Sequence, residues 1–366
     1  MARTSNERGG FRVTSVEHRL PGASRSELAR LLGLAGDVRV DFVDSPALRD
    51  NPLGDPAIRP LAVYTPPGFD PQGSKRYGVL YVLHGYTGDV AAMLATRPWE
   101  TNVVQWADRL IASGEMPPVL LAIIDGNTRL GGSQYVDSIH NGAYATYVRS
   151  DAIGHVDRTY PTIASEGGRA VVGKSSGGFG ALYLAMTAPG IFCAFASHSG
   201  DTNFRAIYIP EFAGAQRVLE RYDGFAAFVE AFEAKPKRSQ AEMHAIMLLG
   251  QAAAFSPLAA ERFAFDVPFD LRTGEIRDDV LERWLAYDPM EMCVAKWAEL
   301  GRLRLRYVDC GRRDEYGLDI GARILVGRMR AMELDVRHEE FDDDHRNVGY
   351  RYAVSLPALA RVLEVG

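Results

Sequence analysis

Short apolar runs rich in β-branched residues alternate with longer helix-like stretches through the middle and the end of the chain. A turn signal follows each run, and residues with helical periodicity come after it. This alternation is typical of a mostly parallel sheet that is covered by helices on both faces. The pattern therefore predicts an α/β fold. The expected strands are Val79–Leu83, Val119–Ile124, Arg169–Val172, Leu303–Val308 and Val336–Phe341.

The first part of the chain has a different pattern. Ser24 and Glu27 have the spacing of a capping box, which predicts the start of a short helix. Two β-type runs follow, Val38–Val43 and Leu61–Tyr64, and a turn-rich loop at residues 45–60 separates them. We expect these runs to form antiparallel strands that lead into the parallel sheet.

Residues 203–289 interrupt the alternation with helical patterns at Phe225–Ala234, Ala241–Ala253 and Asp278–Ala286. No linker-like composition flanks this segment, so we interpret it as a cap or lid inserted into a single domain of residues 1–366. Its aromatic residues suit either an apolar substrate pocket or packing of the cap onto the body. These aromatic residues are Phe204, Tyr208, Phe212, Phe225, Phe228 and Phe232.

A candidate nucleophile follows the expected strand Arg169–Val172. Gly173, Ser175 and Gly177 form the pattern G-x-S-x-G, and the helix-forming run ALYLAM comes after it. A serine in a sharp turn between a strand and a helix needs small neighbours, because the two backbones approach closely there. The helix N-terminus also offers N–H groups and positive potential to an oxyanion. The pattern therefore indicates a nucleophilic serine.

A phosphate-binding loop is the competing interpretation of the same residues. Gly168, Gly173, Lys174 and Ser175 match the pattern G-x-x-x-x-G-K-S. A phosphate loop needs its strand before the first glycine and a flexible loop between the two glycines. Here the β-type run RAVV lies between the glycines, so the context argues against nucleotide binding.

A nucleophilic serine requires a base and an acid that orients the base. In proteins with this turn, both follow the serine in loops after later strands. His345 follows the last expected strand and is the best candidate for the base. Asp314 is the preferred acid because it lies a few residues past a strand end, and Asp309, at the strand end itself, is the alternative.

An oxyanion hole in such a site uses two backbone N–H groups. We expect one from Ser176, directly after the nucleophile, and the other from Tyr86, in the loop after Val79–Leu83. His84 precedes this loop and is expected to brace it. The residues expected to border the substrate pocket are Trp99, Tyr135 and His198.

Charge and cysteine content exclude several other classes. The formal net charge is −6, which gives no basis for binding nucleic acid or an anionic membrane. The three cysteines are far apart and have no metal-type spacing, so neither a metal site nor a disulfide framework is indicated. The N-terminal residues lack the apolar core of a signal peptide, and we find no membrane-spanning run, so a cytoplasmic location is expected.

These features together resemble one branch of the α/β-hydrolases. The chain is similar to the esterase D and feruloyl-esterase group, which includes S-formylglutathione hydrolases, enterochelin-type esterases and mycolyltransferases. The matching stretches cover residues from about 60 to 200 and from about 290 to 360. They are Leu61–Phe69, Leu80–Gly85, Tyr135–Ser138 with Gly142 and Tyr147–Val148, Gly173–Leu182, and Cys310–Gly311 with Asp314 and His345.

The resemblance implies a serine hydrolase that acts on a small-molecule carboxylic ester through an acyl-enzyme, without a metal or an organic cofactor. The chain departs from the family at Lys174 and Ser176, which flank the nucleophile, and after His345, where tryptophans are common. These departures leave the substrate open. Two alternatives use the same fold: an acyltransferase, in which an alcohol replaces water, and a catalytically silent binding protein.

Overall fold

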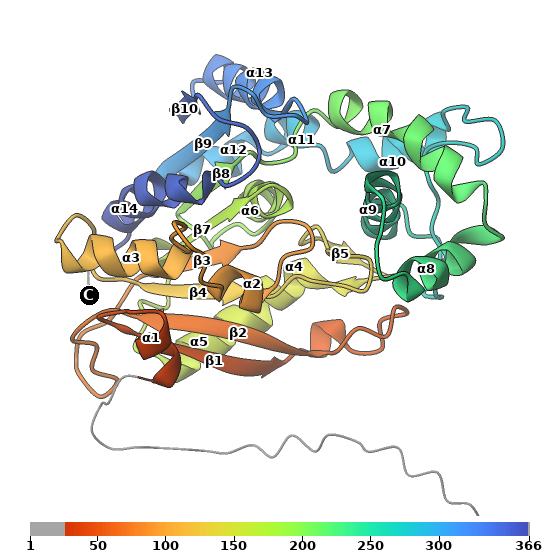
Figure 1. Ribbon diagram of the computed structural model, residues 1–366. Coiled ribbons are helices and arrows are strands. Elements are labelled where there is room, and N and C mark those ends of the chain that lie inside the picture. Colours follow the sequence, from red (N-terminus) through yellow and green to blue (C-terminus); the bar gives the residue numbers. More distant parts are fainter. Residues whose placement is uncertain (1–25, 365–366) are drawn as a thin grey trace, which may run out of the picture.

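The computed structural model describes residues 26–364 and has a twisted central sheet with strand order β1-β2-β4-β3-β7-β8-β9-β10 (Figure 1). β1 pairs antiparallel with β2, and β2 pairs antiparallel with β4. The other neighbours in the sheet are parallel. The strands are β1 (Asp37–Asp44), β2 (Ile58–Thr65), β3 (Val79–Leu83), β4 (Leu120–Ile124), β7 (Arg169–Lys174), β8 (Ala194–His198), β9 (Leu305–Gly311) and β10 (Arg337–Phe341), with a separate ribbon of β5 (Asp137–Ser138) and β6 (Gly142–Ala143). The predicted α/β fold with antiparallel strands at its start is confirmed.

Helices surround this sheet and extend beyond one end of it (Figure 1). The α-helices are α1 (Glu27–Leu31), α2 (Val90–Leu94), α3 (Val103–Ala112), α4 (Tyr144–Thr146), α5 (Ile153–Thr159), α6 (Ser176–Thr187), α7 (Phe204–Leu219), α8 (Gly224–Ala234), α9 (Gln240–Phe255), α10 (Asp278–Leu285), α11 (Pro289–Ala295), α12 (Trp297–Arg302), α13 (Leu318–Ala331) and α14 (Tyr352–Val362). Shorter helical turns are η1 (Pro46–Leu48), η2 (Tyr147–Ala152), η3 (Glu166–Gly168) and η4 (Val348–Arg351). No helix within residues 26–364 is long and apolar enough to cross a bilayer.

Strands β3 and β4 are apolar at every position because both faces of the sheet are covered. In β3, Val79, Tyr81 and Leu83 face a core formed with α5, α6, α11 and α13. Leu80 and Val82 face a second core formed with α1, α3 and α14. Continuous apolar runs are the expected signature of strands that are buried on both sides. This is why β3 is found at the residues that the sequence predicts.

Most strand boundaries differ from the predictions by one to three residues, and two boundary differences affect the interpretation of nearby residues. Helix α1 begins at Glu27 and is capped by Ser26, whose Oγ accepts a hydrogen bond from the Ala29 N–H at 3.1 Å. The predicted cap, Ser24, lies outside the described residues. Strand β9 runs three residues past the predicted end, so Asp309 and Gly311 are part of the strand and not of the following loop. The continued pairing of β9 with β10 as far as Gly311 explains the extension.

The segment 203–289 forms a group of helices, α7 to α10, at one end of the sheet (Figure 1). Sequence periodicity predicts α8, α9 and α10 but not α7, because Pro210 lies inside α7. Proline has no N–H to donate to the carbonyl four residues earlier, and normally ends or kinks a helix. Here Pro210 is exposed, and the apolar side of α7 packs against α9.

Aromatic side chains fill the centre of this segment. Phe204, Tyr208, Phe212, Phe228 and Trp284 are buried in one cluster, which Phe179 of α6 also joins. Phe225 and Phe232 pack against the same cluster and are partly buried. Of the two roles left open by the sequence, these buried contacts favour packing of the segment onto the body.

One carboxylate ties the two ends of the segment together. Asp288, just before α11, accepts hydrogen bonds from the N–H groups of Asn203 at 3.0 Å and Phe204 at 2.6 Å. It also caps α11 by accepting the Met290 N–H at 3.0 Å. The chain thus leaves the sheet after β8 and returns toward β9 at nearly the same point.

Candidate active site

Ser175 lies in a sharp turn between the end of β7 and the start of α6. Its φ of 57° and ψ of −126° are unusual for a residue with a side chain, which indicates local backbone strain. A Cβ atom at Gly177 would lie 2.3 Å from the Leu83 carbonyl oxygen, and one at Gly173 would lie 2.2 Å from the Gly177 carbonyl oxygen. Both glycines of the pattern are therefore required sterically, as the sequence predicts.

The same geometry excludes the phosphate-loop interpretation. Residues 169–174 form β7, so the segment between Gly168 and Gly173 is a buried strand and not a flexible loop. Its N–H groups are used in pairing with β3 and β8 and cannot surround a phosphate. The rejection of nucleotide binding on sequence context agrees with this structure.

The structure brings Ser175, His345 and Asp314 together from three separate loops. His345 Nε2 lies 3.1 Å from Ser175 Oγ, and His345 Nδ1 lies 2.8 Å from Asp314 Oδ2. These loops follow β7, β10 and β9, so the carboxyl ends of parallel strands place them at one edge of the sheet. The serine is able to give its proton to the imidazole, while the carboxylate fixes the ring.

The surroundings keep Asp314 ionised and His345 in place. Burial alone raises the pKa of Asp314, but hydrogen bonds from His345 and from the Tyr316 N–H outweigh it and hold the pKa below its ordinary value. The Tyr316 ring packs edge-on against His345, with ring centroids 4.9 Å apart. The His345 N–H donates to Glu315 Oε2 at 3.0 Å. An ionised acid beside a fixed imidazole is the arrangement that stabilises an imidazolium.

Asp309, the alternative acid, does not contact His345. Its carboxylate is fully buried and binds His198 Nδ1 at 2.7 Å, Arg351 Nε at 2.9 Å and the Tyr307 hydroxyl at 2.9 Å. Because β9 continues past Asp309, that side chain points into the core between β9 and the C-terminal helices. Of the two candidate acids, Asp314 is therefore the one that contacts His345.

The two backbone N–H groups that the sequence predicts for an oxyanion hole belong to segments next to Ser175. Ser176 is the first residue of α6, where a helix has N–H groups without intrahelical partners. The loop that carries Tyr86 packs against the nucleophile, because a Cβ atom at Gly85 would lie 3.4 Å from Ser175 Cβ. Within the described part of the chain, neither the Ser176 N–H nor the Tyr86 N–H has a hydrogen-bond acceptor.

The three expected pocket residues have other surroundings. Trp99 is fully exposed in the loop between α2 and α3, and its contact with a substrate stays a prediction. Tyr135 is buried, and its hydroxyl donates to the His84 carbonyl at 2.9 Å. His198 is buried, and its second ring nitrogen lies 2.8 Å from Ser355 Oγ. The structure thus places Tyr135 and His198 inside the protein, where their side chains bind neighbouring elements, and their contact with a substrate stays a prediction.

Asp201 is a residue near the triad that the sequence analysis misses. It follows β8 by three residues, and its Oδ2 accepts a hydrogen bond from the hydroxyl of Tyr208 in α7 at 3.0 Å. Burial raises the pKa of Asp201 to about 6, and the charges of His345 and Asp314 also act on it. One sequence feature could have identified Asp201, namely its position just after β8. Strand β8 lies between β7, which leads to Ser175, and β9, which leads to Asp314.

A cavity of about 1050 Å³ lies next to the loop after β3 and is lined by Arg59, Asp89, Asp125 and Asn127 among other residues. Ser175 and His345 do not line it, so it is separate from the serine site. Among residues 26–364, no cluster of three or more His, Cys, Asp or Glu side chains is arranged to hold a metal ion.

Comparison with known proteins gives one family and several similar folds. The model of the family described as "Putative esterase" matches residues 58–354. A ferulic acid esterase is 20% identical with a TM-score of 0.56, and the match covers 90% of this chain and 98% of that one. A fluorophosphonate-binding serine hydrolase of Staphylococcus aureus is 14% identical with a TM-score of 0.55, covering 90% and 99%. An S-formylglutathione hydrolase from Agrobacterium tumefaciens is 14% identical with a TM-score of 0.55, covering 90% and 97%.

The structural matches extend over about nine-tenths of this chain. Their low identity makes them informative about the fold, which is that of the α/β-hydrolases. The family match extends over most of the chain and includes the residues of the turn, the acid loop and the base loop. The chain therefore belongs to the Putative esterase family and has the α/β-hydrolase fold.

Proposed function

We propose that this protein hydrolyses a carboxylic ester through Ser175, His345 and Asp314 by way of an acyl-enzyme. The observation that carries the proposal is the continuous contact from Ser175 Oγ to His345 Nε2, at 3.1 Å, and from His345 Nδ1 to Asp314 Oδ2, at 2.8 Å. This arrangement matches the roles of nucleophile, general base and orienting acid. Membership of an esterase family supports the same reaction class.

In the acylation step, Ser175 Oγ attacks the ester carbonyl carbon while His345 Nε2 takes the serine proton. Asp314 holds the proton on Nδ1 and stabilises the imidazolium that forms. The N–H groups of Ser176 and Tyr86 donate hydrogen bonds to the negatively charged carbonyl oxygen. The tetrahedral intermediate then expels the alkoxide, which receives the proton from His345, and the acyl group remains on Ser175.

In the deacylation step, water replaces the alcohol. His345 removes a proton from the water as its oxygen attacks the acyl carbon, and a second tetrahedral intermediate occupies the same hole. Its collapse releases the carboxylic acid and returns the proton to Ser175 Oγ. The cycle consumes one ester and one water and yields one acid and one alcohol, so the enzyme returns to its starting state.

We also propose that the segment 203–289 acts as a cap that limits the size of the substrate. Tyr208 of α7 donates to Asp201, whose carboxyl is close enough to His345 to respond to its charge. Glu211 of the same helix is close enough to affect the hydroxyl of Tyr316, which packs on His345. These contacts support a position for α7 at the border of the site.

The catalytic proposal is tested with p-nitrophenyl acetate and butyrate, using the wild type, Ser175→Ala and a surface serine variant, Ser165→Ala. We expect Ser175→Ala to lose more than about 10⁴-fold in kcat and to lose labelling by a fluorophosphonate probe. Ser165→Ala should behave as the wild type, because its exposed hydroxyl donates to Glu364, which lies far from Ser175 in the sequence and on the surface. Turnover that persists in Ser175→Ala would contradict the assignment of the nucleophile.

The cap proposal requires a separate measurement of selectivity. Glu211→Ala should change the ratio of kcat/KM for butyrate over acetate, while the rate of labelling by a small fluorophosphonate stays near that of the wild type. A selectivity ratio that does not change would show that α7 does not contact the acyl group.

A further inference from the structure

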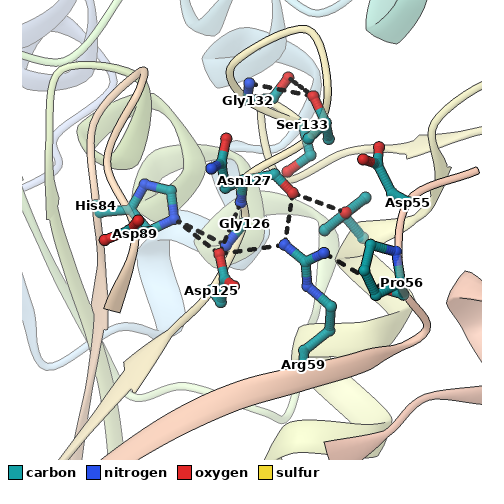
Figure 2. A network of polar contacts seen from close by, with 12 residues as sticks. Asp55, Pro56, Arg59, His84, Asp89, Asp125, Gly126, Asn127, Gly132 and Ser133 are labelled. Carbon is teal, nitrogen blue, oxygen red and sulfur yellow. Dashed lines mark hydrogen bonds and ion pairs between the residues drawn. The ribbon is translucent and has the colours of Figure 1, made fainter. Parts of the chain in front are cut away.

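The imidazole of His84 is held between two backbone groups (Figure 2). The Gly126 N–H donates a hydrogen bond to His84 Nε2 at 2.8 Å. His84 Nδ1 lies 2.8 Å from the carbonyl oxygen of Gly85, the next residue. The side chain is buried, so water does not compete for either nitrogen.

These two contacts define the protonation of the ring. A backbone N–H is only a donor, so Nε2 must be unprotonated to accept from Gly126. A carbonyl oxygen is only an acceptor, so Nδ1 must carry the proton that it shares with Gly85. Both requirements are satisfied by one neutral tautomer. The carboxylate of Asp125 is 3.6 Å from Nε2, which is beyond hydrogen-bond distance.

The Gly85 carbonyl belongs to the peptide that contains the Tyr86 N–H. No peptide bond in the described chain is cis, so this N–H and this carbonyl point in opposite directions. The Gly85 oxygen also accepts the Gly88 N–H at 3.0 Å, which further fixes the peptide plane. A carbonyl that is held toward His84 and Gly88 therefore turns the Tyr86 N–H away from them.

Residues of neighbouring elements hold the loop that presents the Gly126 N–H (Figure 2). Arg59 of β2 lies 3.2 Å from Asp125 Oδ1 and donates to the Asn127 carbonyl at 2.5 Å. Asp125 in turn accepts the Asn127 N–H at 3.0 Å. The side chains of Arg59 and Asp125 are more than nine-tenths buried, so this ion pair is protected from solvent. The support runs from β2 through the loop after β4 to His84.

We propose that His84 is a positioning residue that orients the Tyr86 N–H toward the oxyanion through the hydrogen bond from its Nδ1–H to the Gly85 carbonyl. Arg59 and Asp125 maintain this orientation by fixing the loop after β4, which contains Gly126. The proposal rests on the proposed function, because it assigns a role to a group outside the triad in the same reaction. The buried contacts among Arg59, Asp125 and His84 thereby support catalysis without touching the substrate.

The substitutions His84→Asn and His84→Gln separate this role from simple packing. The amide nitrogen of asparagine is as many bonds from Cα as Nδ1 is, so it is able to donate to the Gly85 carbonyl. The amide of glutamine reaches the position of Nε2, so it is able to accept from Gly126 but does not replace the donor at Nδ1. His155→Gln is the matched control, because His155 pairs with Asp41 at 2.9 Å in another part of the fold.

The measurements are kcat and KM for p-nitrophenyl acetate, the Ki of an alkyl trifluoromethyl ketone, and thermal unfolding. We expect His84→Gln to lose about 100-fold in kcat, the usual effect of one lost oxyanion donor, with KM within about threefold of the wild type. The Ki should rise by a similar factor, because the ketone adduct places an oxyanion in the same hole. His84→Asn should stay within about fivefold of the wild type in both quantities.

Two results would overturn the proposal. One is an equal loss of kcat in His84→Asn and His84→Gln, which would indicate a packing role. The other is an unchanged Ki in His84→Gln, which would show that the hole does not depend on Nδ1–H. The Ser175→Ala protein separates failure of the His84 role from failure of the proposed esterase function. If it is inactive while the His84 series shows no contrast, only the role of His84 fails, and if it is active the proposed function itself fails.

Discussion

Replacing Asp201 with asparagine tests whether a buried carboxyl beside the triad lowers the stability of the fold at neutral pH. Burial raises the pKa of Asp201 from 3.8 to about 6 in the folded protein. An unfolded chain exposes the side chain and returns it to its ordinary pKa. Between these two values the folded state binds the proton and the unfolded state does not. Stability therefore falls as the pH rises from about 4 to about 6.

The size of the effect follows from the two pKa values. Each pH unit in this interval contributes about 1.4 kcal/mol, so the interval from 3.8 to about 6 amounts to about 3 kcal/mol. Asparagine has no charge to bury, and its amide oxygen is able to accept the hydroxyl hydrogen bond of Tyr208. We therefore expect Asp201→Asn to be more stable than the wild type by about 3 kcal/mol at pH 7.5, and by less than about 1 kcal/mol at pH 4.

Urea unfolding at both pH values measures the difference between the two proteins. The other carboxylates are common to both and cancel in the comparison. Asp342→Asn is the control, because Asp342 is exposed on the surface, and its effect should be small at both pH values. A difference between Asp201→Asn and the wild type that is the same at pH 4 and pH 7.5 would refute the reasoning. A variant that is less stable at pH 7.5 would refute it as well.

Three further substitutions test other parts of the structure. Asp314→Asn should lower kcat by about 10⁴-fold, because the amide no longer fixes the imidazole tautomer, and a loss under tenfold in a steady-state assay would argue for another acid. Gly177→Ala should reduce the free energy of unfolding by about 1–3 kcal/mol, since the new methyl overlaps the Leu83 carbonyl, and an unchanged urea midpoint would contradict that overlap. Pro210→Ala should increase stability by about 1–3 kcal/mol by restoring a hydrogen bond within α7, and an unchanged or lower melting temperature in calorimetry would contradict this.

The sequence predicts the sheet well where burial is uniform and less well where a boundary depends on pairing. Val79–Leu83 is apolar throughout because both faces are covered, and its limits are those of β3. The extent of β9 depends on its pairing with β10, which a run ending at Val308 does not reveal. Helix α7 is not predicted because Pro210 has a low helix propensity. The packing of α7 against α9, which stabilises the helix, is not visible in the local sequence.

The candidate site divides in the same way. The turn at Ser175 is recognisable because its steric requirements act on adjacent residues, and Asp314 and His345 are found from chain order after later strands. Residues whose role depends on three-dimensional neighbours are not found. Tyr135 is aromatic and near the motif in sequence, but it supports the His84 carbonyl, and Asp201 is recognised only from its contact with Tyr208.

The Asp288 carboxylate, which joins the start and the end of the segment 203–289, makes this segment exchangeable. A segment whose ends already meet does not constrain the strands on either side, whatever its length. The entropic free-energy cost of closing such a loop grows slowly, by about 0.6 kcal/mol for each doubling of its length. Grafting a shorter or longer segment between Asn203 and Asp288 should therefore leave the sheet and Ser175 in place, provided that the new segment also covers Phe179 of α6. Under the proposed role of this segment, substrate preference would change by insertion or deletion at one junction while Ser175, His345 and Asp314 remain unaltered.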